Sequence, residues 1–188
     1  MRLYYTVIQG DEVIQVSSRF SLGGFKSQSR VPNSQIGNLF SDISNSTVSS
    51  YNQNQYMGLV LINELTVPVI NAKVWFVFPD KCYSLLRIAA VDMAADQNGN
   101  MQMEHIQTIY DKPLMADFVE ADGEDNKVGI GDLAVGEKVG IWIERELLLD
   151  FIKTDQNAVY KDDPVNLGRV LPVPLTTLDD IQIGISWD

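Results

Sequence analysis

Alternating apolar and polar residues predict the clearest element of this chain, a β-strand over residues 138–144. Successive side chains of a strand point to opposite faces. One face therefore holds Val139, Ile141 and Ile143, and the other holds Lys138, Gly140, Trp142 and Glu144. The preceding residues 131–137 (GDLAVGE) are typical of a tight turn, and a polar turn leading into such a strand is typical of an antiparallel sandwich.

Further short apolar runs between turn residues predict the rest of a β-structure. The expected strands cover residues 3–8, 13–16, 57–62, 72–78, 85–91, 101–106, 114–121 and 181–187. Asn98-Gly99 lies between two of these runs, and this dipeptide is a strong signal for a hairpin turn. Short strands at this spacing favour an all-β antiparallel β-sandwich over a doubly wound fold, and we place the sandwich at residues 56–150.

A long polar stretch, residues 17–55, precedes the expected sandwich. We interpret residues 1–55 as an N-terminal hairpin followed by an extended arm rich in Ser, Asn, Gln and Gly. The backbone groups of an ordered polar arm need partners, which neighbouring subunits can supply. The alternative is that the arm folds onto its own domain. The apolar anchors that we expect to be buried against neighbours are Phe20, Phe25, Leu39 and Phe40.

Residues 151–188 are expected to form an extended segment that ends in a strand. Pro164, Pro172 and Pro174 disfavour helix in its first part. A terminal strand needs an edge to pair with, either the N-terminal hairpin or another subunit. Its apolar face supplies the remaining interface candidates, Ile181, Ile183, Ile185 and Trp187.

Charge and composition restrict the possible partners. The chain has 25 acidic and 14 basic residues, a net charge of −11, and 45% hydrophobic residues, enough for one domain with a sizeable core. A chain this acidic repels phosphate backbones and anionic lipid, so we expect no direct nucleic acid and no membrane partner. The apolar run at the N-terminus is too short for a signal peptide or a membrane span, so we expect assembly in a cytoplasm.

Candidate chemical sites are few. Cys82 is the only cysteine, so an internal disulfide and a cysteine zinc site are not expected. His105 is the only histidine, and we interpret it as structural or surface-exposed. Residues 96–107 depart from a calcium loop at its sixth and twelfth positions, which favours a hairpin turn. An acidic patch at Asp122, Glu124, Asp125 and Asp132 is interpreted as solvated. We therefore predict no enzyme and no catalytic, cofactor or metal site.

Several segments of the chain are informative in combination. They are residues 22–27 (LGGFKS), 31–33 (VPN), 38–44 (NLFSDIS), 61–63 (LIN), 71–75 (NAKVW), and 131–137 leading to 142–145 (WIER). Together these segments resemble a family of tailed-bacteriophage virion proteins. The last two elements also resemble ones in immunoglobulin-like modules of bacterial surface proteins. The resemblance implies an immunoglobulin-like sandwich and carries no active-site residue.

The function implied by this resemblance is structural. The chain would be a virion component of the neck or tail ring, or associated with the capsid, and would assemble in the host cytoplasm. Its partners would be copies of itself in a symmetric homo-oligomer and other virion proteins of the portal, neck, tail or capsid. The alternative is a carbohydrate- or receptor-binding module on the virion surface that uses exposed aromatic rings such as Trp75 or Trp142.

Overall fold

The fold is seen in a computed structural model that describes residues 1–8, 21–34, 36, 39–40, 54–77, 84–121, 123–147 and 181–188. Regular structure in these residues is β-strand, apart from two short 3-10 helices, η2 (Pro32–Ser34) and η3 (Glu124–Asn126). None of the helices in these ranges is long and apolar enough to span a membrane. The prediction of an all-β protein is confirmed.

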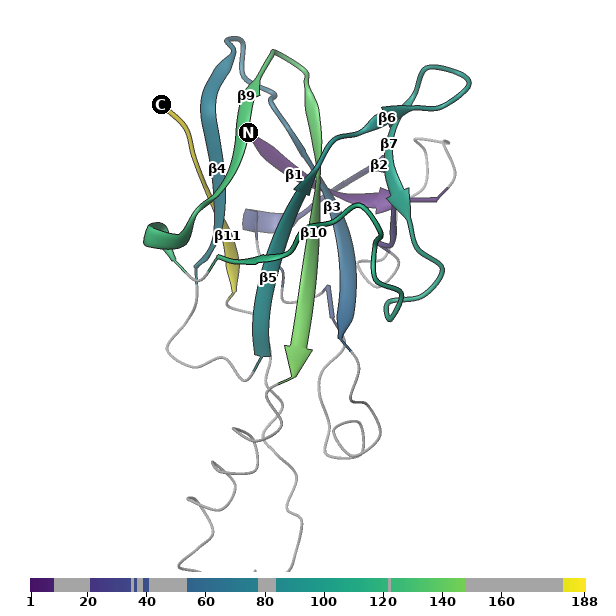
Figure 1. Ribbon diagram of the computed structural model, residues 1–188. Coiled ribbons are helices and arrows are strands. Elements are labelled where there is room, and N and C mark those ends of the chain that lie inside the picture. The colour runs from purple at the N-terminus through teal and green to yellow at the C-terminus, as the bar shows by residue number, and fades with distance from the viewer. Residues whose placement is uncertain are drawn as a thin grey trace, which may run out of the picture.

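Two antiparallel sheets make up the described part of the chain (Figure 1). The smaller sheet has the order β11 (Gln182–Ser186), β4 (Val69–Val77) and β9 (Val128–Leu133). The larger sheet is curled and has the order β6 (Ala94–Ala95), β7 (Met101–His105), β2 (Gly23–Arg30), β1 (Arg2–Val7), β3 (Gln55–Ile62), β10 (Lys138–Leu147), β5 (Ser84–Val91) and β8 (Val119–Glu120).

Strand β10 lies at the centre of the fold and is buried on both faces. Ile141 stands opposite Leu59 of β3 and Ala90 of β5, so these apolar side chains share one face. On the other face Gly140 lets β7 approach, because a Cβ added there would lie 3.1 Å from Cβ of Met103. The larger sheet therefore curls over the face of β10 that holds Gly140. The opposite face of β10, which holds Ile141, packs against the smaller sheet. The predicted strand at 138–144 is confirmed.

The turn before β10 is shorter than the predicted turn at residues 131–137. Strand β9 continues to Leu133, and the turn itself spans residues 134–137, where the N–H of Glu137 donates to the carbonyl of Ala134 at 3.1 Å. Gly136 has φ 79°, a conformation that glycine adopts without steric cost. The buried side chain of Asn63 closes this end of the sandwich, since its Nδ2 donates to the carbonyls of Leu133 and Ala134.

The N-terminal strands belong to the larger sheet, where we expected a separate hairpin and arm. Strand β1 pairs with both β2 and β3, so the sheet begins at residue 2 and not at residue 56. Buried hydroxyl groups make this packing possible. The Thr6 N–H donates to Ser21 Oγ at 2.8 Å, and the Gly23 N–H donates to Thr6 Oγ1 at 2.9 Å. The described polar residues of this region thus find their backbone partners in their own domain.

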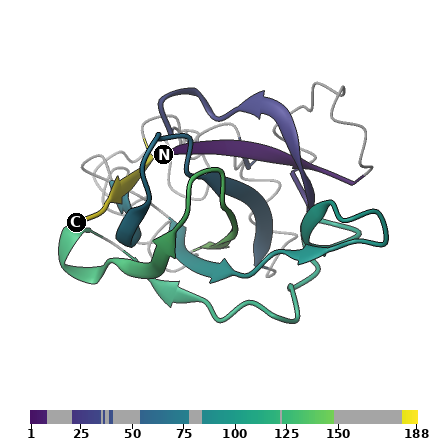
Figure 2. The same ribbon diagram turned by 90° about the horizontal axis from the view of Figure 1, so that it is seen from above.

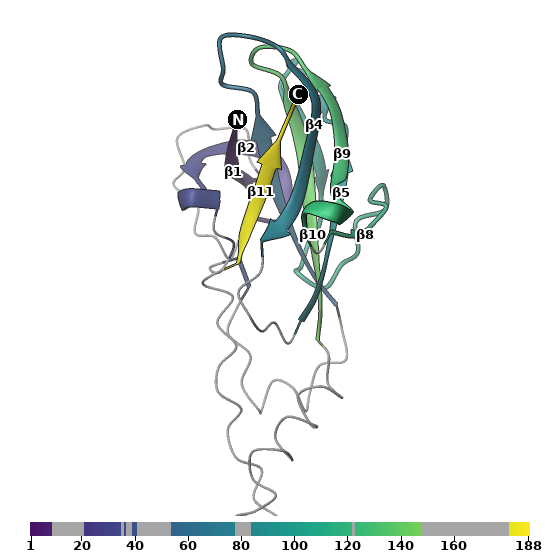
Figure 3. The ribbon, with the colours of Figure 1, turned by 90° about the vertical axis from the view of Figure 1, so that its left-hand side faces the viewer.

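Within its own chain the C-terminal strand pairs with β4 and not with the N-terminal hairpin that we considered, and its pairing with another subunit stays a prediction. Strand β11 lies antiparallel to β4, with Ile183 opposite Phe76. Its start is tied to the N-terminal region, because the N–H of Ile36 donates to the carbonyl of Ile181 at 2.9 Å. Figure 3 shows β11 running along the side of the smaller sheet toward the end of the molecule that also holds the N-terminus.

Most other strand predictions agree with the structure. The expected strands at 3–8, 57–62, 72–78, 85–91, 101–106 and 181–187 correspond to β1, β3, β4, β5, β7 and β11. The hairpin at Asn98-Gly99 is confirmed, since Gly99 has φ 82° between β6 and β7. The expected strand at 114–121 is reduced to the two residues of β8, and the strands β2, β6 and β9 were not predicted. The expected strand at 13–16 lies outside the described residues.

Candidate functional site

A buried carboxylate on β10 organises the most polar part of the interior, which we call the Glu144 cluster: Asn54, Tyr56, Arg87 and Glu144. Glu144 stands opposite Tyr56 of β3 and Arg87 of β5. Its Oε1 accepts hydrogen bonds from the Tyr56 hydroxyl at 3.0 Å and from Asn54 Nδ2 at 2.8 Å. Its Oε2 accepts from Arg87 Nη1 at 2.9 Å, and the same nitrogen lies 2.8 Å from Glu146 Oε2.

The protonation states in this cluster are set by burial and by these contacts. Burial disfavours the Glu144 carboxylate, but hydrogen bonds from Arg87, Asn54 and Tyr56 outweigh it, so the pKa of Glu144 lies below its ordinary 4.5. Burial, followed by the hydrogen bond to Glu144, raises the pKa of Tyr56 to about 12. At neutral pH Glu144 is therefore ionised and Tyr56 is protonated. The cluster links β3, β10 and β5 by charge-assisted hydrogen bonds, which is a structural role.

A second group that again joins a tyrosine and an arginine to a glutamate lies on β1, β2 and the loop after β3, and we call it the Tyr4 cluster: Arg2, Tyr4, Lys26, Arg30 and Glu64. The Tyr4 hydroxyl donates to Glu64 and accepts from Arg30 Nε at 2.9 Å. Arg2 Nε and Arg30 Nη2 lie 3.3 and 3.4 Å from Glu64 Oε2. Burial, followed by the hydrogen bond to Glu64, raises the pKa of Tyr4 to about 12. Lys26 Nζ lies 4.2 Å from the centre of the Tyr4 ring, a cation–π contact.

A cavity of about 440 Å³ lies between β5 and β7. The Glu104 carboxylate on its wall accepts hydrogen bonds from the N–H groups of Leu114 and Met115 at 3.0 and 3.1 Å, so it holds the loop beside the cavity. Buried Trp142 contributes to the lining, and its Nε1 has no hydrogen-bond partner among the described residues. The lining consists of Ala90, Val91, Asp92, Ala94, Gln102, Glu104, Met115 and Trp142.

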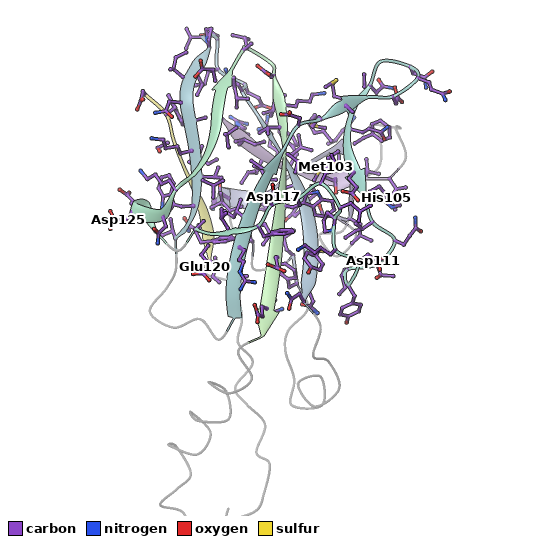
Figure 4. All side chains as sticks on the ribbon, viewed as in Figure 1. Met103, His105, Asp111, Asp117, Glu120 and Asp125 are labelled. Atoms are coloured by element: carbon purple, nitrogen blue, oxygen red, sulfur yellow. The ribbon has the colours of Figure 1, made fainter. Side chains whose placement is uncertain are left out.

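Of the single histidine and the single cysteine that the sequence analysis considered, the structure describes only the histidine. His105 ends β7 beside Met103, opposite Gly23 of β2 (Figure 4). Its Nε2 is buried and has no hydrogen-bond partner within the described ranges. Cys82 lies outside them.

The described acidic residues that we considered as metal ligands accept hydrogen bonds from backbone N–H groups or lie in solvent. Asp96 Oδ1 accepts from the N–H groups of Asn98 and Asn100, which forms the predicted hairpin turn and lowers the pKa of Asp96. Asp132 Oδ1 accepts from the Asn71 N–H at 2.9 Å. Glu124 and Asp125 are exposed, and Asp122 lies outside the described residues. No group of three or more His, Cys, Asp or Glu side chains in the described ranges is placed to hold a metal.

The residues expected at subunit contacts fall into two groups. Leu39, Phe40, Ile181 and Ile183 are buried in the core of their own chain, where the Arg145 guanidinium lies over the Phe40 ring. Their burial therefore needs no neighbouring subunit. Phe25 and Ile185 are half-buried and Trp187 is 44% exposed, so for these three a subunit contact stays a prediction. Phe20 lies outside the described residues.

The tryptophans considered for glycan binding are covered. Trp142 is completely buried, and Trp75 is 8% exposed. The Trp75 ring packs over Gly184 of β11, where an added Cβ would lie 2.3 Å from Cε2 of the ring. Lys127 Nζ lies 4.3 Å from the ring centre. Of the three tryptophans, Trp187 alone presents a substantial part of its surface to solvent.

Neither polar cluster was identified from the sequence. A signal was present for the buried one, since opposite charges at directly paired positions of neighbouring strands stabilise a sheet. Arg87 and Glu144 are such a pair, but the pairing of residues 85–91 with 138–144 had to be known first. The Tyr4 cluster has no local signal, because Glu64 reaches it from the loop after β3. No protein-family model, no curated protein and no solved structure matches this chain.

Proposed function

We propose that this chain is a structural component of a tailed-phage virion that acts through contacts between subunits. It would belong to a neck or tail ring or be associated with the capsid, would assemble in the host cytoplasm, and would contact copies of itself and other virion proteins. An immunoglobulin-like relationship of its sandwich is part of this proposal. The assignment to a tailed-phage particle rests on the sequence resemblance.

The observation that supports subunit contacts is one of the two edges of the smaller sheet, strand β11. Strand β11 has a ladder partner, β4, on one side only within the described residues. Edge strands with free backbone groups readily pair with another chain. Two apolar side chains lie beside the C-terminal end of β11, Trp187, which is 44% exposed, and Ile70, which is 50% exposed. The N–H of Asp188, next to Trp187 in the chain, donates to the Ile70 carbonyl. Exposed apolar side chains next to an open edge are typical of an interface.

The native mass of the full chain tests self-association. We expect the wild-type chain to form a closed oligomer and Trp187→Ser to shift it toward the monomer, because the variant removes an apolar contact. Val135→Ser is the matched control, since Val135 is 55% exposed in the turn before β10. A wild-type chain that stays monomeric would overturn self-assembly.

The virion assignment has its own test. We expect mass spectrometry to detect peptides of this chain in purified tailed-phage particles from infected cells. Detection of the chain in the soluble fraction of those cells, with none in the particles, would contradict the assignment.

A further inference from the structure

Positive charge gathers on one side of this acidic molecule. Strands β1 and β2 have six and eight residues and carry three cations, Arg2, Lys26 and Arg30, and no acid. We call these three residues the basic flank. Glu64 is the acceptor of both arginines. Counted over these four described side chains, three cations and one carboxylate leave an excess of two positive charges (3 − 1). The side chains of Arg2 and Arg30 are 51% and 54% exposed.

Three exposed carboxylates lie on the opposite side. Glu120 of β8 and Glu124 and Asp125 of η3 are exposed, and we call them the acidic flank. Lys127 lies 3.9 Å from Glu124, whose side chain is 76% exposed. Figures 2 and 3 both show β1 and β2 on one side of the molecule and the segment of β8 and η3 on the other. Figure 4 shows Glu120 and Asp125 on the same side of the ribbon.

We propose that the basic flank of one copy docks against the acidic flank of the next copy. This inference rests on the self-association proposed above, and it adds to the β11 edge two charged surfaces that give the contact a polarity. Two different surfaces on opposite sides join subunits head to tail, and such a contact closes into a ring or continues as a filament. Complementary charge orients the partners and raises the rate of encounter.

The overall charge decides which anionic partner fits best. A nucleic acid that reached the basic flank would also meet the field of a chain with a net charge of −11, which repels phosphate. A second copy carries the same net charge, but it can present its acidic flank alone, with three carboxylates and the cation Lys127, whereas a nucleic acid is negatively charged along its whole length. The observations therefore favour a second copy of this chain as the partner of the basic flank.

The experiment uses two double variants of the full chain. Lys26→Glu with Arg30→Glu reverses the basic flank, and Glu124→Lys with Asp125→Lys reverses the acidic flank. We expect each variant alone to associate at least about tenfold more weakly than wild type at about 0.05 M salt, and the difference to shrink at about 0.5 M. An equimolar mixture should regain oligomers, because each contact between the two variants again joins opposite charges.

The mixture distinguishes an electrostatic contact from a folding defect, since a misfolded variant is not rescued by its counterpart. Asp92→Lys is matched to Asp125→Lys as a control, because both aspartates are exposed and only Asp125 belongs to a flank. Wild-type oligomers that persist in both double variants, or a mixture that stays monomeric, would overturn the docking proposal and leave self-association standing. A wild-type chain that never associates would overturn both.

Loss of double-stranded DNA binding in the basic-flank variant, with unchanged oligomers, would also overturn the docking proposal. It would instead assign the basic flank to nucleic acid.

Discussion

The Glu144 cluster and the Tyr4 cluster contain the same three types of side chain in different surroundings. Each joins a tyrosine hydroxyl and an arginine guanidinium to one glutamate, and in each the pKa of the tyrosine rises to about 12. Glu144 has a side chain that is 6% exposed, between two neighbouring strands. Glu64 is 29% exposed in a loop, with arginines that are more than half exposed.

The difference shows that burial determines how much the same chemical groups contribute to stability. A buried ion pair is costly to break, because the remaining charge loses both its partner and water. An exposed pair exchanges its partner for water at little cost, so it contributes little to stability and stays available for another surface. The buried cluster therefore supports the sheet, whereas the exposed cluster can take part in recognition.

Removing each glutamate gives the largest expected contrast. We expect Glu144→Ala to lower the free energy of unfolding by about 3–5 kcal/mol, because it leaves buried donors without their acceptor. Glu64→Ala should lower it by less than about 1 kcal/mol. Urea denaturation of both variants measures the difference. Equal losses would contradict the distinction between the clusters.

The tyrosine hydroxyls provide a smaller contrast. Tyr56→Phe removes a donor to a buried carboxylate and should cost about 1.5–3 kcal/mol, as expected for a hydrogen bond to a charged group. Tyr4→Phe removes a hydroxyl that lies beside exposed charges, and we expect about 0.5 kcal/mol. Thermal and urea unfolding report both values. A larger loss for Tyr4→Phe would reverse the ranking of the clusters.

Acid should weaken the buried cluster through Glu144. Its pKa is lower in the folded chain than the ordinary 4.5, so its stabilising contribution is present above pH 4.5 and is lost as the pH falls through the folded pKa. We expect this part of the pH dependence to disappear in Glu144→Gln. Urea denaturation from pH 7 to pH 3 tests it, and an unchanged pH profile in the variant would assign the acid sensitivity to other carboxylates.

Both tyrosines should resist ionisation at high pH. Their pKa values of about 12 exceed the ordinary 10.0, so the stability they contribute is present below pH 10 and is lost as the pH rises from 10 to 12. In an absorbance titration of tyrosinate, we expect Tyr4→Phe and Tyr56→Phe each to remove one late-titrating group. A variant that instead removes an ordinary group near pH 10 would show that its tyrosine is unperturbed.

Salt gives the smallest expected effect and separates the clusters further. Raising the salt from about 0.1 M to about 1 M shortens the screening length from about 10 to about 3 Å. The cost of Glu64→Ala should then fall toward zero, while that of Glu144→Ala should change little because its partners are buried. Similar salt dependence in the two variants would contradict the difference in burial.

Strands with strong local patterns were predictable, whereas elements made by distant residues were not. The alternation in 138–144 and 181–187 and the Asn98-Gly99 turn depend on neighbouring residues, and all three are confirmed. Strand β2 was missed because its sequence, GGFKSQSR, is mostly polar, and its place beside β1 depends on buried hydroxyls at Thr6 and Ser21. The candidate polar clusters were missed for the same reason, since the residues that hydrogen-bond to each other in them lie 26 to 90 residues apart.

The sequence by itself determined the class of fold, the position of most strands and the acidic character of the chain. Side-chain alternation and turn chemistry act within a few residues, so they can be read without the fold. Only the tertiary structure decided that both faces of β10 are buried, that β11 pairs with β4, and that one glutamate is enclosed while another is exposed. Burial and electrostatics depend on which distant segments pack together, because the surrounding atoms determine how far water can screen each charge.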